Sequence, residues 1–578
     1  MIPRTANVRH ALANIWPSIV RPRLSRQRLI ADAFLLGVCG AIAAQVFGLL
    51  LRGTTSLFLL HLAGYQAPGL PNEGGVLQQV IGGHGLWLVP VATTIGGLAV
   101  GLITQWLGPE AAGHGTDTVI RAFHWKDGAL RARVPVVKLV ASAITIGSGG
   151  SAGREGPIAL VTAGFGSLYA SLTRREGRDR RLLLVIGMAA GLSAIFRSPI
   201  GTALFAIEVL YADMQFESGA LLYAMLASIV AYAVNGAISG WEPLFRVPST
   251  IEQLHAAGDY GWFIVLGVGA GVLGTVLPAL FYAVRDLFLR LPVKPFLRPA
   301  IGGLLTGLLA LALPQVIGGG YGWIQEAING QLLLSTLLVL VGAKMVALTF
   351  TVASGGSGGV FAPSLFIGAM FGGACAAVFH QPPLPFVIVG MAAVFAGAAH
   401  VPVATLMMVV EMTGGYALLV PAALAVMLSY LVQMQLSSRL KYRSIYEAQV
   451  ASRADSPAHR AQHVDIALRI LREQAPGYLA GVGELELLPL LRSGMPIELP
   501  GERRLIVGVL HADSPFVDTT VGASGRKLDG VGSNIIAILR GEHMLVPDAD
   551  TRLEAGDRLI LVVREAGIEQ LRTHFDLW

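Results

Sequence analysis

Long apolar stretches with few charges recur along the first three quarters of the chain. They cover residues 29–51, 86–107, 182–195, 261–281, 301–317, 332–350 and 418–434. A helix of about 20 apolar residues crosses the roughly 30 Å hydrocarbon core of a bilayer. Several stretches reach that length, so the pattern predicts an all-α polytopic membrane domain embedded in a lipid bilayer.

Other apolar segments are too short for a full crossing and begin at clusters of glycine and proline. Segments 157–172 and 363–379 have this form. Non-helical backbone at membrane depth must be buried in protein or line a cavity. These segments therefore predict broken or re-entrant helices beside a substrate pathway.

Charge is distributed unevenly between the membrane part and the tail. Only 13% of the 578 residues are charged, against about 25% in an ordinary soluble domain. Residues 442–578 hold 34 of the 78 Lys, Arg, Asp and Glu residues, so a soluble domain is expected there. The net charge of +6 combines a basic membrane part with an acidic tail, and nucleic-acid binding is not expected.

The N-terminal segment, residues 1–28, is rich in arginine. It carries no acidic residue, and its arginines are Arg4, Arg9, Arg21, Arg23, Arg26 and Arg28. Basic residues beside a membrane span remain on the cytoplasmic side, and no signal-peptide pattern is present. We therefore predict a multi-pass protein of the inner membrane with both termini in the cytoplasm. The two cysteines, Cys39 and Cys375, lie in apolar segments, so no disulfide, metal site or cofactor is expected.

The membrane part contains an internal repeat. Residues 138–157 (KLVASAITIGSGGSAGREGP) match residues 344–363 (KMVALTFTVASGGSGGVFAP) at ten of twenty positions. Residues 187–208 match residues 390–411 at seven of 22 positions, including the final glutamate. The two halves, roughly 29–240 and 261–441, therefore share one plan.

Each copy of the first motif ends in a Ser/Gly run followed by a proline. This form leaves unpaired backbone N–H groups and the positive end of a helix dipole inside the membrane. Repeats of membrane transporters place such helix ends at a midplane site, where they suit an anion. Glycine runs also permit close helix packing, but two copies in register favour an anion site.

The two copies differ where the chemistry of the site is decided. Glu155 of the first copy corresponds to Phe361 of the second, and a carboxylate there competes with the anion and can gate its passage. Glu208 and Glu411 occur in both halves. Their symmetric placement favours a structural role, such as bonding exposed backbone N–H groups, over a transport role.

Four segments resemble the anion-site segments of the CLC chloride channel and transporter family. They are PEAAG at 109–113, GREGP at 153–157, GGVFAP at 358–363 and Tyr446, expected at a helix end, in SIYEA. The sequence is most similar to the bacterial ClcB type, for example in AGRE at 152–155 and GGGY at 318–321. The resemblance implies inverted-topology repeats over 29–441 and a homodimer with a chloride pore in each subunit.

The resemblance also implies roles for individual residues. Glu155 is the expected gate. The expected chloride-binding residues are Gly153, Arg154, Gly156, Val360, Phe361 and Tyr446. One segment departs from the family, because its usual GSGIP is here GHGTD at 113–117, so that His114 replaces the serine. His114 is expected either as a chloride ligand or as a hydrogen-bonded residue at a helix start.

Residues 503–577 resemble the C-terminal domain of potassium channel regulators, called TrkA-C. We expect a small α+β cytoplasmic domain with strands at 505–510, 534–540 and 558–563 and a helix at 567–575, after a linker over 442–502. Such domains dimerise, and some bind a small molecule. Both roles remain open, because no residue identifies a ligand.

The sequence favours a chloride channel over three alternatives. A cation transport component would need a filter such as TVGYG, which is absent. A membrane enzyme would need a nucleophile elbow, zinc helix or Walker loop, and none is present. In the antiporters of the family, an inner proton-transferring glutamate follows the residue equivalent to Glu208, but this chain has Val209. We therefore predict an uncoupled channel gated by Glu155 and by voltage or pH, with a chloride/proton antiporter as the alternative.

Overall fold

The computed structural model divides the chain into two compact units, Met1–Gln449 and Val450–Trp578. The residues that it describes are 6–73, 75–83, 85–175, 177–247, 257–459, 497–499, 503–528, 534–540, 543–545, 547–564, 568–571 and 575–577. Most of the linker predicted for 442–502 lies outside these residues. Residues 442–449 belong to the first unit, where Ile445 N donates to Ala398 O over 2.8 Å.

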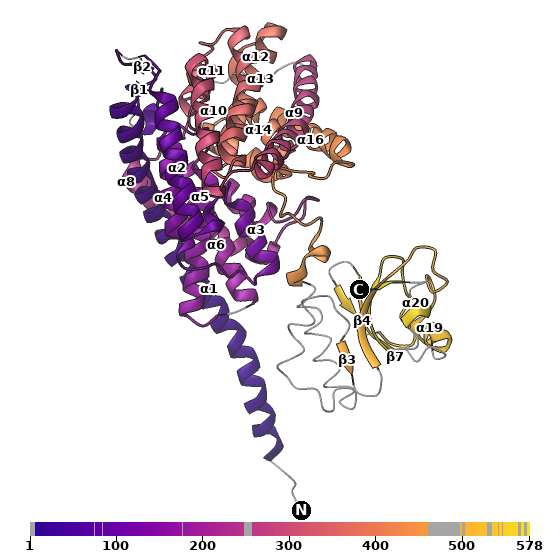
Figure 1. Ribbon diagram of the computed structural model, residues 1–578. Helices are drawn as coiled ribbons and strands as arrows, with labels where there is room; N and C mark the ends of the chain where they lie inside the picture. Colours follow the sequence, from indigo (N-terminus) through magenta and orange to yellow (C-terminus); the bar gives the residue numbers. More distant parts are fainter. Residues whose placement is uncertain are drawn as a thin grey trace, which may run out of the picture. The chain divides into compact units, whose positions relative to one another are not determined.

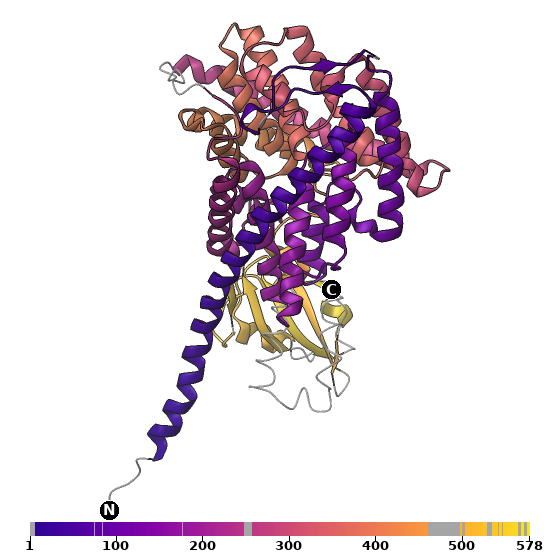
Figure 2. The ribbon, with the colours of Figure 1, turned by 90° about the vertical axis from the view of Figure 1, so that its left-hand side faces the viewer.

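The first half of the membrane unit is built from α1 to α8. A π-helix at Ser56–Leu62 continues α1, and a two-stranded ribbon joins β1 (Tyr65–Gln66) to β2 (Val80–Ile81). The α-helices are α1 (Ala6–Thr55), α2 (Val89–Leu107), α3 (Thr116–Trp125), α4 (Val134–Gly147), α5 (Glu155–Leu172), α6 (Arg178–Phe196), α7 (Pro199–Glu208) and α8 (Ser218–Ser239). Figure 2 shows α1 as one continuous indigo helix.

The second half repeats this order with α9 to α16. Its helices are α9 (Ala257–Arg290), α10 (Arg298–Ala312), α11 (Tyr321–Ile328), α12 (Leu334–Leu348), α13 (Phe361–Phe379), α14 (Pro383–Ala399), α15 (Pro402–Thr413) and α16 (Leu419–Ser437). A short 3₁₀ turn precedes α3 at Pro109–Ala111, and another precedes α11 at Pro314–Val316. Figure 1 shows the halves as an indigo-to-magenta group and a pink-to-orange group of helices.

The halves pack against each other through equivalent helices. α2 contacts α10, and α7 contacts α15. The carboxylate of Glu208, at the end of α7, accepts N–H bonds from Val403 and Ala404 at the start of α15. In return Glu411, at the end of α15, accepts N–H bonds from Ile200 and Gly201 at the start of α7. The two helices are therefore antiparallel, as an inverted repeat requires.

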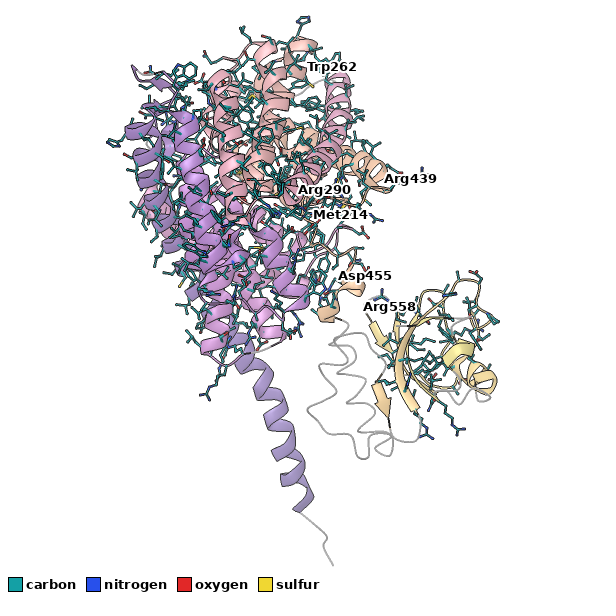
Figure 3. All side chains as sticks on the ribbon, viewed as in Figure 1. Met214, Trp262, Arg290, Arg439, Asp455 and Arg558 are labelled. Carbon is teal, nitrogen blue, oxygen red and sulfur yellow. The ribbon has the colours of Figure 1, made fainter. Side chains whose placement is uncertain are left out.

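Eight helices within the described residues are long and apolar enough to cross a membrane. One of them is the 31-residue span Tyr260–Arg290 of α9, near whose ends Figure 3 labels Trp262 and Arg290. α5 and α13 begin at Glu155 and Phe361, two residues before the prolines at which the sequence placed them. Proline thus occupies the third helical position, where its missing N–H costs no helical hydrogen bond.

The second unit contains an antiparallel sheet in the order β3-β4-β7-β5-β6, with β8 also pairing β4. Arg558 of β7 lies 3.1 Å from the Asp455 carboxylate (Figure 3). The elements described in the second unit are β3 (Ile497–Leu499), β4 (Arg503–Leu510), α19 (Val521–Leu528), β5 (Asn534–Arg540), β6 (His543–Leu545), β7 (Arg558–Arg564), α20 (Ile568–Leu571) and β8 (Phe575–Leu577).

The helix predicted for 567–575 is wrong in its second part. α20 ends at Leu571, and Phe575 instead begins β8, which pairs with Gly508–Leu510 of β4. The Phe575 ring is buried and stacks on Phe516 with ring centroids 6.0 Å apart. Pairing with β4 satisfies the backbone while the ring enters the core, so tertiary contacts override the local helical pattern.

Candidate anion-binding site

Three loops from both halves meet at the centre of the membrane unit. Gly153 N donates to Gly359 O over 2.8 Å, and Gly359 N donates to Gly153 O over 2.6 Å. The third loop joins through Gly113, whose N donates to Gly356 O over 3.1 Å and whose O accepts from Gly358 N over 3.2 Å. These bonds tie GHGTD, GREGP and GGVFAP into one cluster, so segments more than 200 residues apart form a single site.

Glycine is required where the loops cross. A Cβ atom on Gly156 would lie 2.1 Å from the backbone oxygen of His114. Gly115 has φ of +91°, and a Cβ atom there would lie 2.8 Å from Gly156 O. No side chain fits between these backbones, which explains why the motif is rich in glycine.

Two helix N-termini point into this cluster. α5 begins at Glu155 and α13 begins at Phe361. The first N–H groups of a helix have no carbonyl partner within the helix, and the helix dipole adds partial positive charge. Such ends bind anions without a full positive charge that would retain a permeant ion.

The Glu155 carboxylate lies in this positive region and is almost fully buried, at 1% exposure. Its Oε1 atom accepts a hydrogen bond from the Tyr321 hydroxyl. Its Oε2 atom has no hydrogen-bond partner and rests against Gly153, where an added Cβ atom would lie 2.0 Å from it. A carboxylate therefore fills the place that the helix N-termini offer to an anion.

Arg154, predicted as a chloride-binding residue, is turned toward Glu73 and Tyr321. Its guanidinium pairs with the Glu73 carboxylate and lies 5.3 Å from the centre of the Tyr321 ring. Two neighbouring cavities of about 500 and 450 Å³ are both lined by Arg52, Glu73 and Arg154. The smaller one also reaches Gly153 and Tyr321, so it gives access to the Glu155 side of the site.

Val360 and Phe361, on the second helix start, are buried at 1% and 3% exposure. The Phe361 ring packs on Phe196 and Phe395, with ring centroids 4.5 and 4.3 Å away. Because the ring is held in this aromatic cluster, only the backbone N–H groups of the segment are available to an anion.

Tyr446 is buried at 2% exposure. The sequence predicted it at a helix end, and this prediction is wrong. α16 ends at Ser437, and Tyr446 lies in an irregular segment. Side chains bond that backbone, because Ser444 Oγ accepts from Tyr446 N over 3.1 Å and Tyr282 Oη accepts from Glu447 N over 3.1 Å. A serine of the same segment and a tyrosine of α9 thus replace helical hydrogen bonds around Tyr446.

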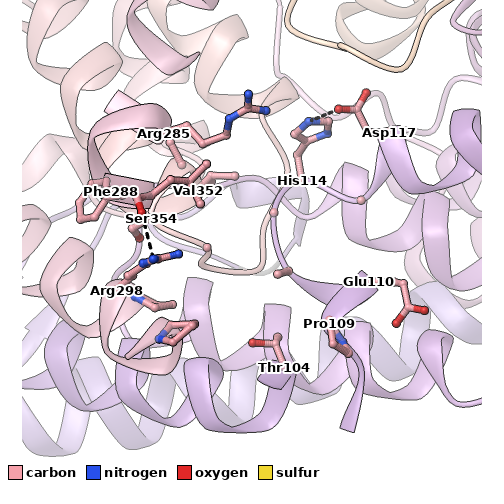
Figure 4. A pocket seen from close by; sticks show the side chains of 18 of the residues that line it. Thr104, Pro109, Glu110, His114, Asp117, Arg285, Phe288, Arg298, Val352 and Ser354 are labelled. Atoms are coloured by element: carbon pink, nitrogen blue, oxygen red, sulfur yellow. Dashed lines mark hydrogen bonds and ion pairs between the residues drawn. The ribbon is translucent and has the colours of Figure 1, made fainter. Parts of the chain in front are cut away.

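His114 lies on the Tyr446 side, with the two ring centroids 5.5 Å apart. Its Nε2 atom is 3.2 Å from Asp117 Oδ2, whereas the buried Nδ1 atom has no hydrogen-bond partner. Figure 4 shows His114 turned toward Asp117 at the edge of a cavity of about 740 Å³. Four basic residues, Arg121, Lys126, Arg285 and Arg298, line this cavity against two acidic ones, Glu110 and Asp117, so its lining carries a net positive charge that attracts an anion.

Val209 is fully buried at the end of α7. Its carbonyl accepts a hydrogen bond from Gln449 Nε2 over 3.1 Å. Its side chain is a hydrocarbon and cannot hold a proton.

Sequence reasoning did not single out two buried lysines that brace the site. Lys138 Nζ donates to the carbonyls of Ala111 and Gly113 over 3.0 and 2.6 Å. Lys344 Nζ donates to the carbonyls of Val316 and Gly318 over 2.8 and 2.6 Å. Both lysines begin the repeated motif. Extending the repeat backwards would therefore have aligned 109–116 with 314–321 and drawn attention to Tyr321.

Comparisons with known proteins agree with this architecture. Residues 96–434 match the family described as Voltage gated chloride channel. A ClcB-like chloride channel protein of Ralstonia nicotianae is 31% identical over 70% of this chain and 92% of its own length. The voltage-gated ClC-type chloride channel ClcB of Salmonella typhimurium is 30% identical over 73% of this chain and 99% of its own length.

Solved structures share the fold. A slow cyanobacterial Cl⁻/H⁺ antiporter has a TM-score of 0.63 at 22% identity, covering 72% of this chain and 96% of its own. A CLC-type fluoride/proton antiporter has a TM-score of 0.62 at 24% identity, covering 74% and 99%. These likenesses confirm the predicted fold class, and residues 509–576 match the TrkA-C domain. The chain belongs to the CLC family and carries a TrkA-C domain after its membrane unit.

Proposed function

We propose that the protein conducts chloride across the membrane along a pathway gated by Glu155. The observation that carries this proposal is the position of the Glu155 carboxylate. It lies at the N-terminus of α5, with one cavity reaching Gly153 and Tyr321 and another reaching His114. An anion that passes through must displace this carboxylate, and protonation removes the negative charge that keeps it there.

The chloride pathway uses partial charges and a hydroxyl group. The backbone N–H groups of Gly156, Val360 and Phe361 supply donors at the two helix starts, and the Tyr446 hydroxyl supplies one from the His114 side. Gly153 keeps the centre of the pathway free of a side chain, and Arg154 attracts anions at the Glu155 side. The names of the curated relatives, which are chloride channels, support chloride as the ion.

Val209 supports uncoupled conduction, because a proton relay to Glu155 lacks a carboxylate at this position. A chloride/proton antiporter is the second candidate. It is favoured by the solved structures of the same fold, which are antiporters.

The deciding experiment records chloride and proton movement together in proteoliposomes that contain the full-length protein. A chloride gradient should drive chloride flux without stoichiometric uphill proton movement, whereas coupled proton movement at several pH values would support the antiporter. Glu155→Gln and Glu155→Ala should each give chloride flux that no longer depends on pH. Retained pH dependence in both variants would remove Glu155 as the gate.

The remaining assignments complete the proposal. The protein forms a homodimer in the inner membrane with a pathway in each subunit and with both termini, including residues 1–28, in the cytoplasm. The membrane domain spans residues 29–441. Of the linker predicted for 442–502, residues 442–449 pack with the membrane unit, and the remainder leads to a regulatory domain at 503–577. That domain dimerises or binds a small molecule.

A further inference from the structure

Tyr321 contributes the hydrogen bond that holds the Glu155 carboxylate. It is the first residue of α11, and its hydroxyl donates to Glu155 Oε1. The other carboxylate oxygen, Oε2, has no hydrogen-bond partner. Among the described residues, Tyr321 is therefore the side chain that donates a hydrogen bond to this buried carboxylate.

The internal repeat explains why a side chain of the second half reaches Glu155. Tyr321 corresponds to Thr116, since each is the first residue of its helix and follows a glycine with positive φ, +91° at Gly115 and +81° at Gly320. In the first half this position faces Tyr446, whose hydroxyl interacts with Thr116. In the second half it faces Glu155. The inverted repeat therefore sets one residue against each side of the central site.

The Tyr321 ring is held by a cation over its face and by a second aromatic ring. The Arg154 guanidinium lies 5.3 Å from the ring centre and is itself paired with Glu73 of the 3₁₀ turn Pro71–Glu73. The Phe245 ring packs on it with centroids 5.9 Å apart. A ring held by a cation and a second ring keeps its hydroxyl aimed at the carboxylate.

We propose that Tyr321 is a positioning residue that latches the ionised Glu155 carboxylate in the anion pathway. The Arg154–Glu73 pair fixes the ring, and the hydroxyl holds the carboxylate. This inference rests on the proposed gating role of Glu155 and adds a second residue that sets the pH at which the gate opens.

The sign of the effect follows from the bond. A hydroxyl donor stabilises a carboxylate more than a carboxylic acid, so the latch delays protonation as pH falls. Among the described residues, the other charged or titratable groups around the site are Arg154, which is paired with Glu73, and Tyr446 with the His114–Asp117 pair and Lys138. None of them changes in Tyr321→Phe, which removes one oxygen atom and keeps the ring under Arg154.

The test measures chloride efflux from proteoliposomes across a pH series. Tyr321→Phe should move the pH of half-maximal flux upward by about one to two units, the shift that corresponds to one hydrogen bond to a charged group. Tyr169→Phe is the matched control, because the Tyr169 hydroxyl donates to the Asp32 carboxylate over 2.8 Å away from the site. It should leave the midpoint unchanged.

Adding Tyr321→Phe to Glu155→Gln should change nothing further, because the latch has no carboxylate to hold. A midpoint unchanged in Tyr321→Phe, while Glu155→Gln abolishes pH dependence, would overturn the latch and leave the gate intact. An equal shift in the Glu155→Gln background would overturn the latch as well, since Tyr321 would then act elsewhere. Persistent pH dependence in Glu155→Gln would overturn both proposals. If the phenylalanine variant folds poorly, Tyr321→Met also removes the hydroxyl, and because it removes the ring under Arg154 as well, its midpoint should rise by at least as much.

Discussion

A methyl group at Gly153 would occupy the space that the Glu155 carboxylate fills. The Cβ atom of Gly153→Ala would lie 2.0 Å from Glu155 Oε2, whereas ordinary contact begins at 3.4 Å. The oxygen must therefore move by about 1.4 Å, the difference between these distances. It is the end of a flexible side chain, and Gly153 has no positive φ, so alanine displaces the carboxylate without straining the backbone. The Ala362 methyl group, 3.0 Å from the new Cβ atom, must move by a few tenths of an ångström as well.

The displacement also breaks the bond from Tyr321. A hydrogen bond to a charged group contributes about 1.5–3 kcal/mol, and each 1.4 kcal/mol is a factor of ten in an equilibrium constant. The population with the carboxylate in place should therefore fall by roughly 10- to 150-fold. Chloride flux at neutral pH should exceed that of the unmodified protein and lose most of its dependence on pH, but it should stay below that of Glu155→Gln because the new methyl group lies in the anion pathway.

The assay is the proteoliposome flux measurement, with Gly156→Ala as the contrasting variant. Its Cβ atom would meet the His114 backbone oxygen at 2.1 Å, and a backbone cannot swing aside. Gly156→Ala should therefore lower expression and thermal stability, whereas Gly153→Ala should not. A Gly153→Ala protein with the pH profile of the unmodified protein would refute the placement of Glu155. If Gly153→Ala also increased chloride flux in the Glu155→Gln background, displacement of the carboxylate could not be the cause of the increase.

Three further predictions concern the scaffold, the coupling and the tail. Lys138→Met and Lys344→Met each leave two buried carbonyls without their donor. Each substitution should destabilise the protein by about 2–5 kcal/mol, as measured by thermal unfolding in detergent. An unchanged unfolding temperature would contradict the role of these lysines in holding the loops. Val209→Glu should introduce uphill proton movement in sealed vesicles if the missing carboxylate is what prevents coupling. If no proton movement followed, another feature would have to prevent the coupling. A chain ending after Arg453 should still insert, dimerise and conduct chloride with altered gating, whereas a folded, dimeric but silent protein would show that the tail is needed for conduction.

The repeat in the sequence predicted that the two Ser/Gly runs meet inside the membrane unit. Matching Ser/Gly runs before Glu155 and Phe361 predicted two helix starts facing one anion position. The structure joins these runs through the paired bonds of Gly153 and Gly359. The meeting of the two runs is confirmed, because a glycine-rich loop at membrane depth must bury its polar backbone and a second loop of the same kind supplies matching partners.

Tyr446 and Phe575 show where local patterns fail. Both lie in segments whose conformation is decided by distant partners, such as Ala398 for the residue before Tyr446 and β4 for Phe575. Neither partner can be read from neighbouring residues in the sequence. The Tyr321 latch was missed for a related reason, because it joins residues 166 positions apart and only the repeat places them together.

The inverted repeat also determines where a gate can arise. The buried lysines and the crossed glutamates Glu208 and Glu411 obey the two-fold relation, and a scaffold built only from such pairs would treat the two directions through the membrane alike. A difference between the two directions of ion passage must then come from positions where the halves differ. Glu155 differs from Phe361, and Tyr321 differs from Thr116. These differences bring a carboxylate and its hydroxyl donor together on one side of the site. The proposed gate and the proposed latch therefore depend on each other, and either one alone would leave a buried polar group without its partner.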